Sequence, residues 1–147
     1  MIRKVKPLDE DFVYHSWLHS VKCPTKTVTR MTRCLIDNVI KEEAISVWCP
    51  DDDPNHIIGW IAHGKLEDTN LLHFIFVKKN FRKNGIANDL LRHVYPEGTP
   101  VFCTFWSWHM QQLDARRKWD AKFVGNLLPS VIYTILHPEE GGAAYAS

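Results

Sequence analysis

The sequence predicts an α+β fold in which helices flank a mixed central β-sheet. The first observation is the order of the periodic segments: two helices, three strands, a helix, a strand, a helix and a strand. The second is the segment Val77–Leu91, where an apolar strand end leads through a basic loop with one glycine into an amphipathic helix. At 147 residues the chain suits one domain. We expect that domain over residues 1–138 and a flexible tail over 139–147.

Two helices are expected before the sheet. Asp9, Glu10 and Asp11 place acid where the N-terminal end of a helix favours it. Two sets of apolar residues then recur at helical spacing, separated by Pro24 and ending near Lys41. The first set is Tyr14, Trp17, Leu18 and Val21, and the second is Val28, Met31, Leu35 and Val39.

Strands are expected in the middle of the chain. Ile45–Cys49 and Ile57–Ala62 are short apolar runs on either side of a turn rich in Pro and Asp, which predicts a β-hairpin. Gly64–Asn70 is expected to form another turn, and Leu71–Val77 the strand after it. The next helix buries Ala87, Leu90, Leu91 and Val94 and ends at Pro96–Gly98. The remaining elements are a strand at Pro100–Phe105, a helix from about Ser107 or Gln111 to Trp119, and a strand at Val131–Leu136.

Composition excludes several classes of protein. The net charge of +1 gives no global electrostatic case for nucleic-acid binding. No apolar run is long enough for a membrane span, and the first residues lack a signal-peptide core. The four cysteines show no Cys-x-x-Cys spacing, so we expect reduced thiols and no zinc or redox site.

The loop after Val77 has the features of a phosphate site. The free N–H groups of a helix N-terminus, together with the helix dipole, attract anions. Gly85 permits a close approach of the backbone to a ligand. Positive side chains on the same loop are Lys78, Lys79, Arg82 and Lys83. The alternative interpretation is a plain strand-turn-helix whose basic loop is simply solvated.

The run Arg82–Ala87 resembles the Arg/Gln-x-x-Gly-x-Gly/Ala signature of the GCN5-related N-acetyltransferases, the GNAT family. Val77 stands where that family ends its fourth strand, and Leu90 and Leu91 stand where the helix packs onto the sheet. The resemblance implies the acyl-CoA N-acyltransferase fold, with strands that splay apart at the cofactor, and acetyl-CoA or another acyl-CoA as the cofactor. It also implies a first strand within Met1–Val5 and a further strand near Lys122–Val124.

The resemblance further implies which residues hold the cofactor. The pyrophosphate would lie on the loop and the pantetheine arm along the strand before it, like an added strand. A backbone N–H near the end of that strand would polarise the thioester carbonyl. The implied residues are Ile75, Phe76 and Val77 on the strand, and Arg82, Lys83, Asn84, Gly85, Ile86 and Ala87 on the loop.

His73 is the first candidate for the general base. On a strand of period two, Leu71, His73, Ile75 and Val77 share one face. Many family members carry a carboxylate on this strand, whereas the run from Leu71 to Val77 holds no Asp or Glu. Histidine has an ordinary pKa near 6.5, which suits base catalysis near neutrality. The alternative is a histidine at the edge of the core that bonds a neighbour.

The group that protonates the leaving thiolate is open. The family often has a tyrosine in the helix after the splayed strands, and the matching stretch, residues 115–123, has none. His109, Cys103 or solvent could take that role.

The candidate acceptor-binding residues are Tyr14, Trp17 and Trp106. Core packing is the alternative, and we favour it for Trp17 and Trp60. One residue among Trp106, Trp108 and His109 is expected to face the cleft, because the three cannot all be buried on one side.

The leading functional prediction is an enzyme that moves an acetyl group from acetyl-CoA to an unknown amine, on a small molecule, a protein or a nucleic acid. One alternative is a non-catalytic binding protein of the same fold, such as a phage effector acting on a host protein. Another is a transferase that modifies a nucleic-acid base or an aminoacyl-RNA. The runs 12–18 and 72–77 are similar to small acetyltransferase-like proteins of tailed phages, which implies action in a bacterial cytoplasm. We expect a monomer or homodimer that does not enter a membrane.

Overall fold

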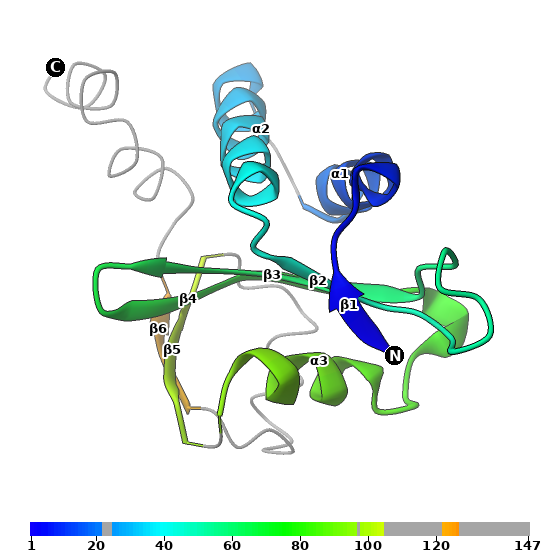
Figure 1. Ribbon diagram of the computed structural model, residues 1–147. Coiled ribbons are helices and arrows are strands. Elements are labelled where there is room, and N and C mark those ends of the chain that lie inside the picture. The colour runs from blue at the N-terminus through cyan, green and yellow to red at the C-terminus, as the bar shows by residue number, and fades with distance from the viewer. Residues whose placement is uncertain (22–24, 97, 105–121, 127–147) are drawn as a thin grey trace, which may run out of the picture.

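A six-stranded sheet forms the centre of the molecule, and its strands lie in the order in which they occur along the chain. The computed structural model describes residues 1–21, 25–96, 98–104 and 122–126 (Figure 1). The pairs β1–β2, β2–β3 and β3–β4 are antiparallel, and the pairs β4–β5 and β5–β6 are parallel. This arrangement confirms the predicted mixed sheet. The strands are β1 Ile2–Lys4, β2 Ile45–Trp48, β3 Gly59–Leu66, β4 Thr69–Val77, β5 Pro100–Cys103 and β6 Lys122–Asn126.

Helices cover both faces of the sheet. Helices α1 (Glu10–Ser20) and α2 (Lys26–Lys41) lie over one face, and α3 (Ile86–Val94) lies over the other (Figure 1). Single 3₁₀ turns at Pro7–Asp9 and Lys79–Phe81 precede α1 and the loop before α3. Within the described ranges no helix is long and apolar enough to cross a membrane.

The two faces of the sheet carry separate cores. Helix α2 has a strongly one-sided apolar pattern, and its buried positions include Leu35, Ile36 and Val39. With Trp17 of α1 and Trp60 of β3 they pack on the first face. The second core, under α3, contains Ile58, Ile61, Leu72, Ile75, Ile86, Leu90, Leu91, Tyr95, Val101 and Cys103.

An irregularity in β4 changes which residues share a face. Ala62 pairs with Phe74 and His63 pairs with Leu72, so His73 is an extra residue in the ladder, a β-bulge. Phe74 consequently joins the first core and Ile75 the second. The prediction that His73 shares a face with Ile75 and Val77 is therefore wrong, because period-two alternation does not continue through a bulge.

The other elements follow the sequence with small shifts. The expected turn at Gly64–Asn70 is shorter, because β3 and β4 extend to a tight hairpin over Glu67 and Asp68. The strands expected within Met1–Val5 and near Lys122–Val124 are present as β1 and β6. The expected helix ending at Trp119, the strand at Val131–Leu136 and the tail lie outside the described residues.

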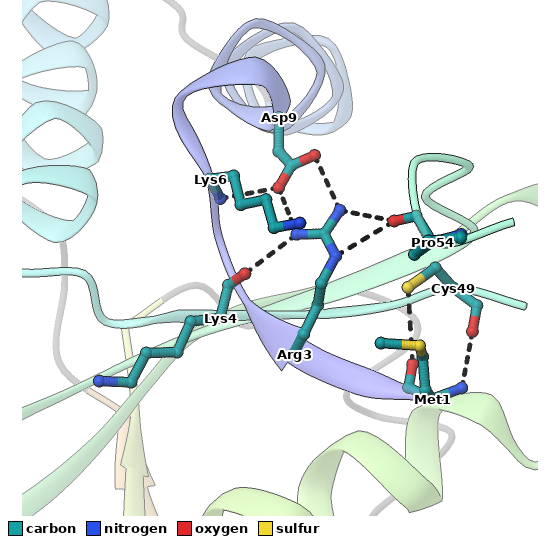
Figure 2. A network of polar contacts seen from close by, with 7 residues as sticks. All are labelled: Met1, Arg3, Lys4, Lys6, Asp9, Cys49 and Pro54. Carbon is teal, nitrogen blue, oxygen red and sulfur yellow. Dashed lines mark hydrogen bonds and ion pairs between the residues drawn. The ribbon is translucent and has the colours of Figure 1, made fainter. Parts of the chain in front are cut away.

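A polar network joins β1 to the start of α1 and to the loop after β2 (Figure 2). The Arg3 guanidinium donates two hydrogen bonds to the Asp9 carboxylate, at 2.6 and 3.1 Å, and two more to the Pro54 carbonyl. The backbone N–H of Lys6 donates to the same carboxylate at 2.7 Å. Since the Asp9 side chain is only 2% exposed, these bonds satisfy a carboxylate that water does not reach.

Candidate active site

The described ladder between strands β4 and β5 is short. It consists of the pairs Leu71–Phe102 and Leu72–Cys103, followed by one bond from the Thr104 N–H to the Leu72 carbonyl. In the described part of the chain, no strand pairs with His73–Val77 on the β5 side. We call this side of the second half of β4 the inner edge.

The antiparallel ladder decides which groups the inner edge presents. The Lys78 N–H bonds to the Ile58 carbonyl, which marks that pair as hydrogen-bonded. Bonded and non-bonded pairs alternate along such a ladder, so Phe76 and Phe74 turn their backbone groups toward β3. Ile75 and Val77 accordingly turn theirs toward the inner edge. These are two of the residues predicted to hold the cofactor.

The loop after β4 reaches α3 through two left-handed backbone positions. Lys83 and Gly85 have positive φ, of 69° and 78°, and left-handed positions of this kind occur in anion-binding turns. The first helical bond of α3 runs from the Asp89 N–H to the Gly85 carbonyl. The N–H groups of Ile86 and Ala87 precede it and lack a backbone acceptor among the described residues, as expected for a helix N-terminus.

Gly85 suits a backbone conformation that other residues adopt only with strain. A Cβ added there would meet no protein atom within 4 Å, so the protein itself does not crowd this position. At a φ of 78°, however, an L side chain strains the backbone. The open space above Gly85 is where a ligand phosphate would approach the N–H groups.

The basic side chains of the loop differ in their contacts. The Arg82 Nε donates to the Val77 carbonyl at 2.9 Å and so ties the loop to the end of β4. The ammonium of Lys78 lies 5.0 Å from the centre of the Phe12 ring, a cation–π contact that places it against α1. Lys79 and Lys83 are exposed and have no such contact in the described structure. They are the cations most available to a bound phosphate.

His73 is buried at the end of the described β4–β5 ladder. It is 3% exposed, and its Nδ1 lies 3.0 Å from Oγ1 of Thr104. Its ring centre lies 6.4 Å from that of Trp17. Burial, and to a smaller extent the nearby His63, lower the pKa of His73 to about 4. The ring is therefore neutral at pH 7, and it bonds a neighbour as the alternative interpretation predicts.

The acceptor-binding candidates lie in different environments. Trp17 is fully buried between Trp60 and Phe74, with ring centres 5.4 and 6.0 Å away, so its ring offers no surface to an acceptor. This placement agrees with the packing interpretation. Tyr14 is half-buried on α1, and burial raises the pKa of its hydroxyl. Trp106 and His109 lie outside the described residues.

Two residues near His73 escaped the sequence analysis. Thr104 is 1% exposed. Its Oγ1 contacts Nδ1 of His73, and its N–H donates the last hydrogen bond of the described β4–β5 ladder. A Cβ on Gly64 would lie 2.8 Å from Nε2 of His73, so glycine is needed there for space. A polar residue at the end of an apolar strand was the available clue for Thr104. No local pattern marks Gly64, because its neighbour comes from another strand.

An open depression lies at the opposite end of α3 from the loop. None of the predicted site residues lines it, and in the described part of the chain no group of three or more His, Cys, Asp or Glu could hold a metal. Its lining includes Lys4, Glu42, His63, Lys65, His93 and Thr99. The inner edge and the loop, rather than this depression, carry the features of a cofactor site.

Comparison with known proteins gives the same fold. The family model described as Acetyltransferase (GNAT) family matches residues 12–99, which contain α1, α2, β2 to β4 and α3. No curated protein matches the sequence.

Solved structures also match. A GCN5-related N-acetyltransferase from Sphaerobacter thermophilus is 21% identical, with a TM-score of 0.52, over 64% of this chain and 30% of that one. Ard1 from Thermoplasma volcanium is 21% identical, with a TM-score of 0.47, over 63% and 59%. A structure of histone acetyltransferase HPA2 and related acetyltransferase from Corynebacterium glutamicum is 13% identical, with a TM-score of 0.50, over 80% and 82%. The chain thus spans under two thirds of the first two proteins. At these identities the likeness concerns the fold alone.

Proposed function

The chain belongs to the GNAT family of acetyltransferases, and on that premise we propose that it transfers an acetyl group from acetyl-CoA to an amine. The observation that carries the proposal is the inner edge of β4, which ends at a helix N-terminus with free N–H groups. A strand edge beside an anion site accommodates one long ligand with an amide-bearing arm and a phosphate.

The residues present fit acetyl-CoA. Its pyrophosphate would bind the N–H groups of Ile86 and Ala87, with Lys83 beside it. The amides of its pantetheine arm would pair with Ile75 and Val77. When bound, acetyl-CoA supplies a thioester whose carbonyl carbon an amine can attack, and no residue of the chain need be acylated.

The protein's part in the reaction is positioning and proton transfer. In such a transfer a C–N bond would form and the C–S bond would break, so one proton would have to leave the amine and one would have to reach the sulfur. A backbone N–H at the inner edge would stabilise negative charge on the carbonyl oxygen. We assign the amine's proton to His73, which is neutral at pH 7 and, being only 3% exposed, would reach an amine only if its ring became accessible; we assign the thiolate's proton to solvent.

Thermal unfolding with and without acetyl-CoA tests the cofactor site. A ligand that binds only the folded state, at a free concentration about 100 times its Kd, raises the free energy of unfolding by roughly 2.7 kcal/mol. Gly85→Asp should abolish this gain. Gly98→Asp is the matched control, because Gly98 has the same φ of 78° and the same free space but lies beyond α3. If acetyl-CoA stabilised both variants equally, the loop that contains Gly85 would not be part of the cofactor site.

Release of CoA thiol with a panel of amines tests the activity. His73→Gln should lower kcat by about 100-fold, the usual scale for loss of a general base, with little change in KM for acetyl-CoA. An unchanged kcat would remove His73 as the base without affecting the cofactor site.

A second candidate function is a binding protein that holds acetyl-CoA without transferring its acetyl group. The burial of His73, together with the lack of a carboxylate from Leu71 to Val77, favours it. Cofactor binding without thiol release from any amine would support this function.

The acceptor and the setting are further proposals. A nucleic-acid acceptor predicts binding to RNA or DNA that weakens steeply with salt. The similarity to tailed-phage proteins adds the proposal that the chain acts in the cytoplasm of an infected bacterium.

A further inference from the structure

Thr104 makes three polar contacts at the end of the described β4–β5 ladder. Its N–H donates to the Leu72 carbonyl at 3.0 Å. Its Oγ1 lies 3.0 Å from Nδ1 of His73 and 3.4 Å from the carbonyl oxygen of the same histidine. Both side chains are almost fully buried, so water does not compete for these contacts.

The hydroxyl has only one hydrogen to give, and this limits the arrangement. If it donates to Nδ1, its contact with the His73 carbonyl has no hydrogen. If it donates to the carbonyl, the ring must supply the hydrogen for the other contact, so Nδ1 carries a proton. The second arrangement gives a hydrogen to both contacts, the 3.0 Å contact with the ring and the longer, weaker 3.4 Å contact with the carbonyl, whereas the first leaves the longer contact without one.

The other ring nitrogen has a different environment. Nε2 of His73 faces Gly64 in β3, where even a methyl group would come within 2.8 Å. The described structure gives Nε2 no hydrogen-bond partner. A nitrogen without a hydrogen needs no acceptor at this position, whereas an N–H would lack one in the described structure.

We propose that Thr104 holds His73 in the tautomer that carries its hydrogen on Nδ1, which leaves Nε2, the atom that faces Gly64, as the basic nitrogen. Thr104 is a positioning residue, since it acts through His73. The catalytic meaning of the tautomer rests on the proposed function, whereas the tautomer itself does not.

Long-range ¹H–¹⁵N correlation spectra of the full-length, ¹⁵N-labelled protein at pH 7 test this directly. Protonated and bare ring nitrogens resonate far apart, so the spectrum reports the tautomer, and loss of signals in His73→Gln assigns them. The wild type should show a protonated Nδ1 and a bare Nε2. Thr104→Val should move the population toward protonated Nε2, and Thr104→Ser should retain the wild-type pattern.

Thr32→Val is the matched control. It also removes a buried threonine hydroxyl, but one that donates to the Val28 carbonyl within α2. It should leave the His73 signals unchanged. A protonated Nε2 in the wild type would overturn the proposal, even if Thr104→Val failed to fold. An unchanged tautomer in a folded Thr104→Val would overturn it as well.

The spectra need neither acetyl-CoA nor an acceptor, so failure of the proposed function does not affect them. If transfer is observed, Thr104→Val should lower kcat at least tenfold with little change in KM for acetyl-CoA, and Thr104→Ser should restore it. A purely structural role would instead leave the tautomer alone.

Discussion

Among single residues, Asp9 shows how a buried charge is compensated. Burial alone would raise the pKa of its carboxyl. The hydrogen bonds from Arg3 and from the Lys6 N–H together outweigh that effect, so the pKa lies below its ordinary value. Arg3 responds in the opposite direction, and its pKa is raised chiefly by the hydrogen bond to Asp9. The pair fixes β1 against the start of α1.

Asp9→Asn should therefore lower the free energy of unfolding by about 3 kcal/mol, because removing one partner leaves the other charge poorly compensated. Urea unfolding at pH 7 measures the loss. Asp52→Asn is the control, since Asp52 is exposed in the loop between β2 and β3. A loss no larger than that of the control would show that the ion pair contributes nothing.

The same pair predicts a pH dependence of defined sign. A carboxyl whose pKa is lower in the folded than in the unfolded state stabilises the fold above the unfolded value, about 3.9. That stability is lost as the pH falls through the lowered folded pKa. Unfolding curves of wild type and Asp9→Asn should thus differ fully at pH 6 and converge below about pH 4. A difference that stays constant down to pH 2.5 would contradict this origin.

Among the elements, α2 ends in an unusual way. Its last turn has the two bonds of a Schellman motif, from the Glu43 N–H to the Ile40 carbonyl and from the Ala44 N–H to the Val39 carbonyl. The left-handed position of this motif usually holds glycine, but here Glu43 takes it with a φ of 55°. A glutamate in that conformation costs stability.

Glu43→Gly should consequently raise the free energy of unfolding by up to about 1 kcal/mol, since relief of the strain exceeds the added freedom of the unfolded chain. Glu42→Gly is the control, because Glu42 has a φ of −80° and needs no glycine. It should be neutral or destabilising. Chemical denaturation of both variants measures the change in the free energy of unfolding. Equal changes would show that the backbone of Glu43 is not strained.

The inner edge of β4 predicts a pattern of hydrogen exchange. The N–H groups of Ile75 and Val77 should exchange faster than those of Phe74 and Phe76, which bond to β3. Acetyl-CoA should slow the first pair by at least tenfold and change the second pair less. Amide-resolved exchange with and without the cofactor measures this. Uniform slowing of all four would mean that the cofactor does not pair with the strand.

The elements differ in how far the sequence could predict them. Helix α2 and the loop at Arg82–Ala87 depend on local spacing, and both were predicted within a few residues. The bulge at His73 depends on how β4 pairs with β3, and the contact with Thr104 depends on β5. Such pairings join residues far apart in the chain, and period-two alternation carries no information about them.

At the scale of the whole molecule, the sheet has two parts that meet over a short stretch. Strands β3 and β4 share a long ladder, whereas within the described residues β5 joins β4 only at Leu71 and Leu72, and β6 pairs with β5. Leu72 is fully buried in the second core, and its carbonyl accepts the Thr104 N–H. We therefore expect the packing of Leu72 to affect the position of β5 beside the inner edge.

Leu72→Ala and Leu90→Ala should each cost about 3 kcal/mol, as expected for a fully buried leucine. Only Leu72→Ala should also weaken acetyl-CoA binding in the folded protein, by at least tenfold, because Leu90 packs in the same core away from the junction. Calorimetric titration of both variants below their unfolding temperature tests this. Equal affinities would mean that the packing of Leu72 does not affect the cofactor site.

The inner edge of β4 also affects the tendency of the protein to aggregate. Backbone groups at a strand edge pair readily with strands of other chains, and such pairing begins aggregation. From His73 to Val77 this edge is apolar apart from the histidine, and it carries no acidic or basic gatekeeper. Bound acetyl-CoA would occupy the same groups. We therefore expect the cofactor-free protein to aggregate more readily than the cofactor-bound protein. The concentration of acetyl-CoA in the cell would then affect how much of this protein aggregates.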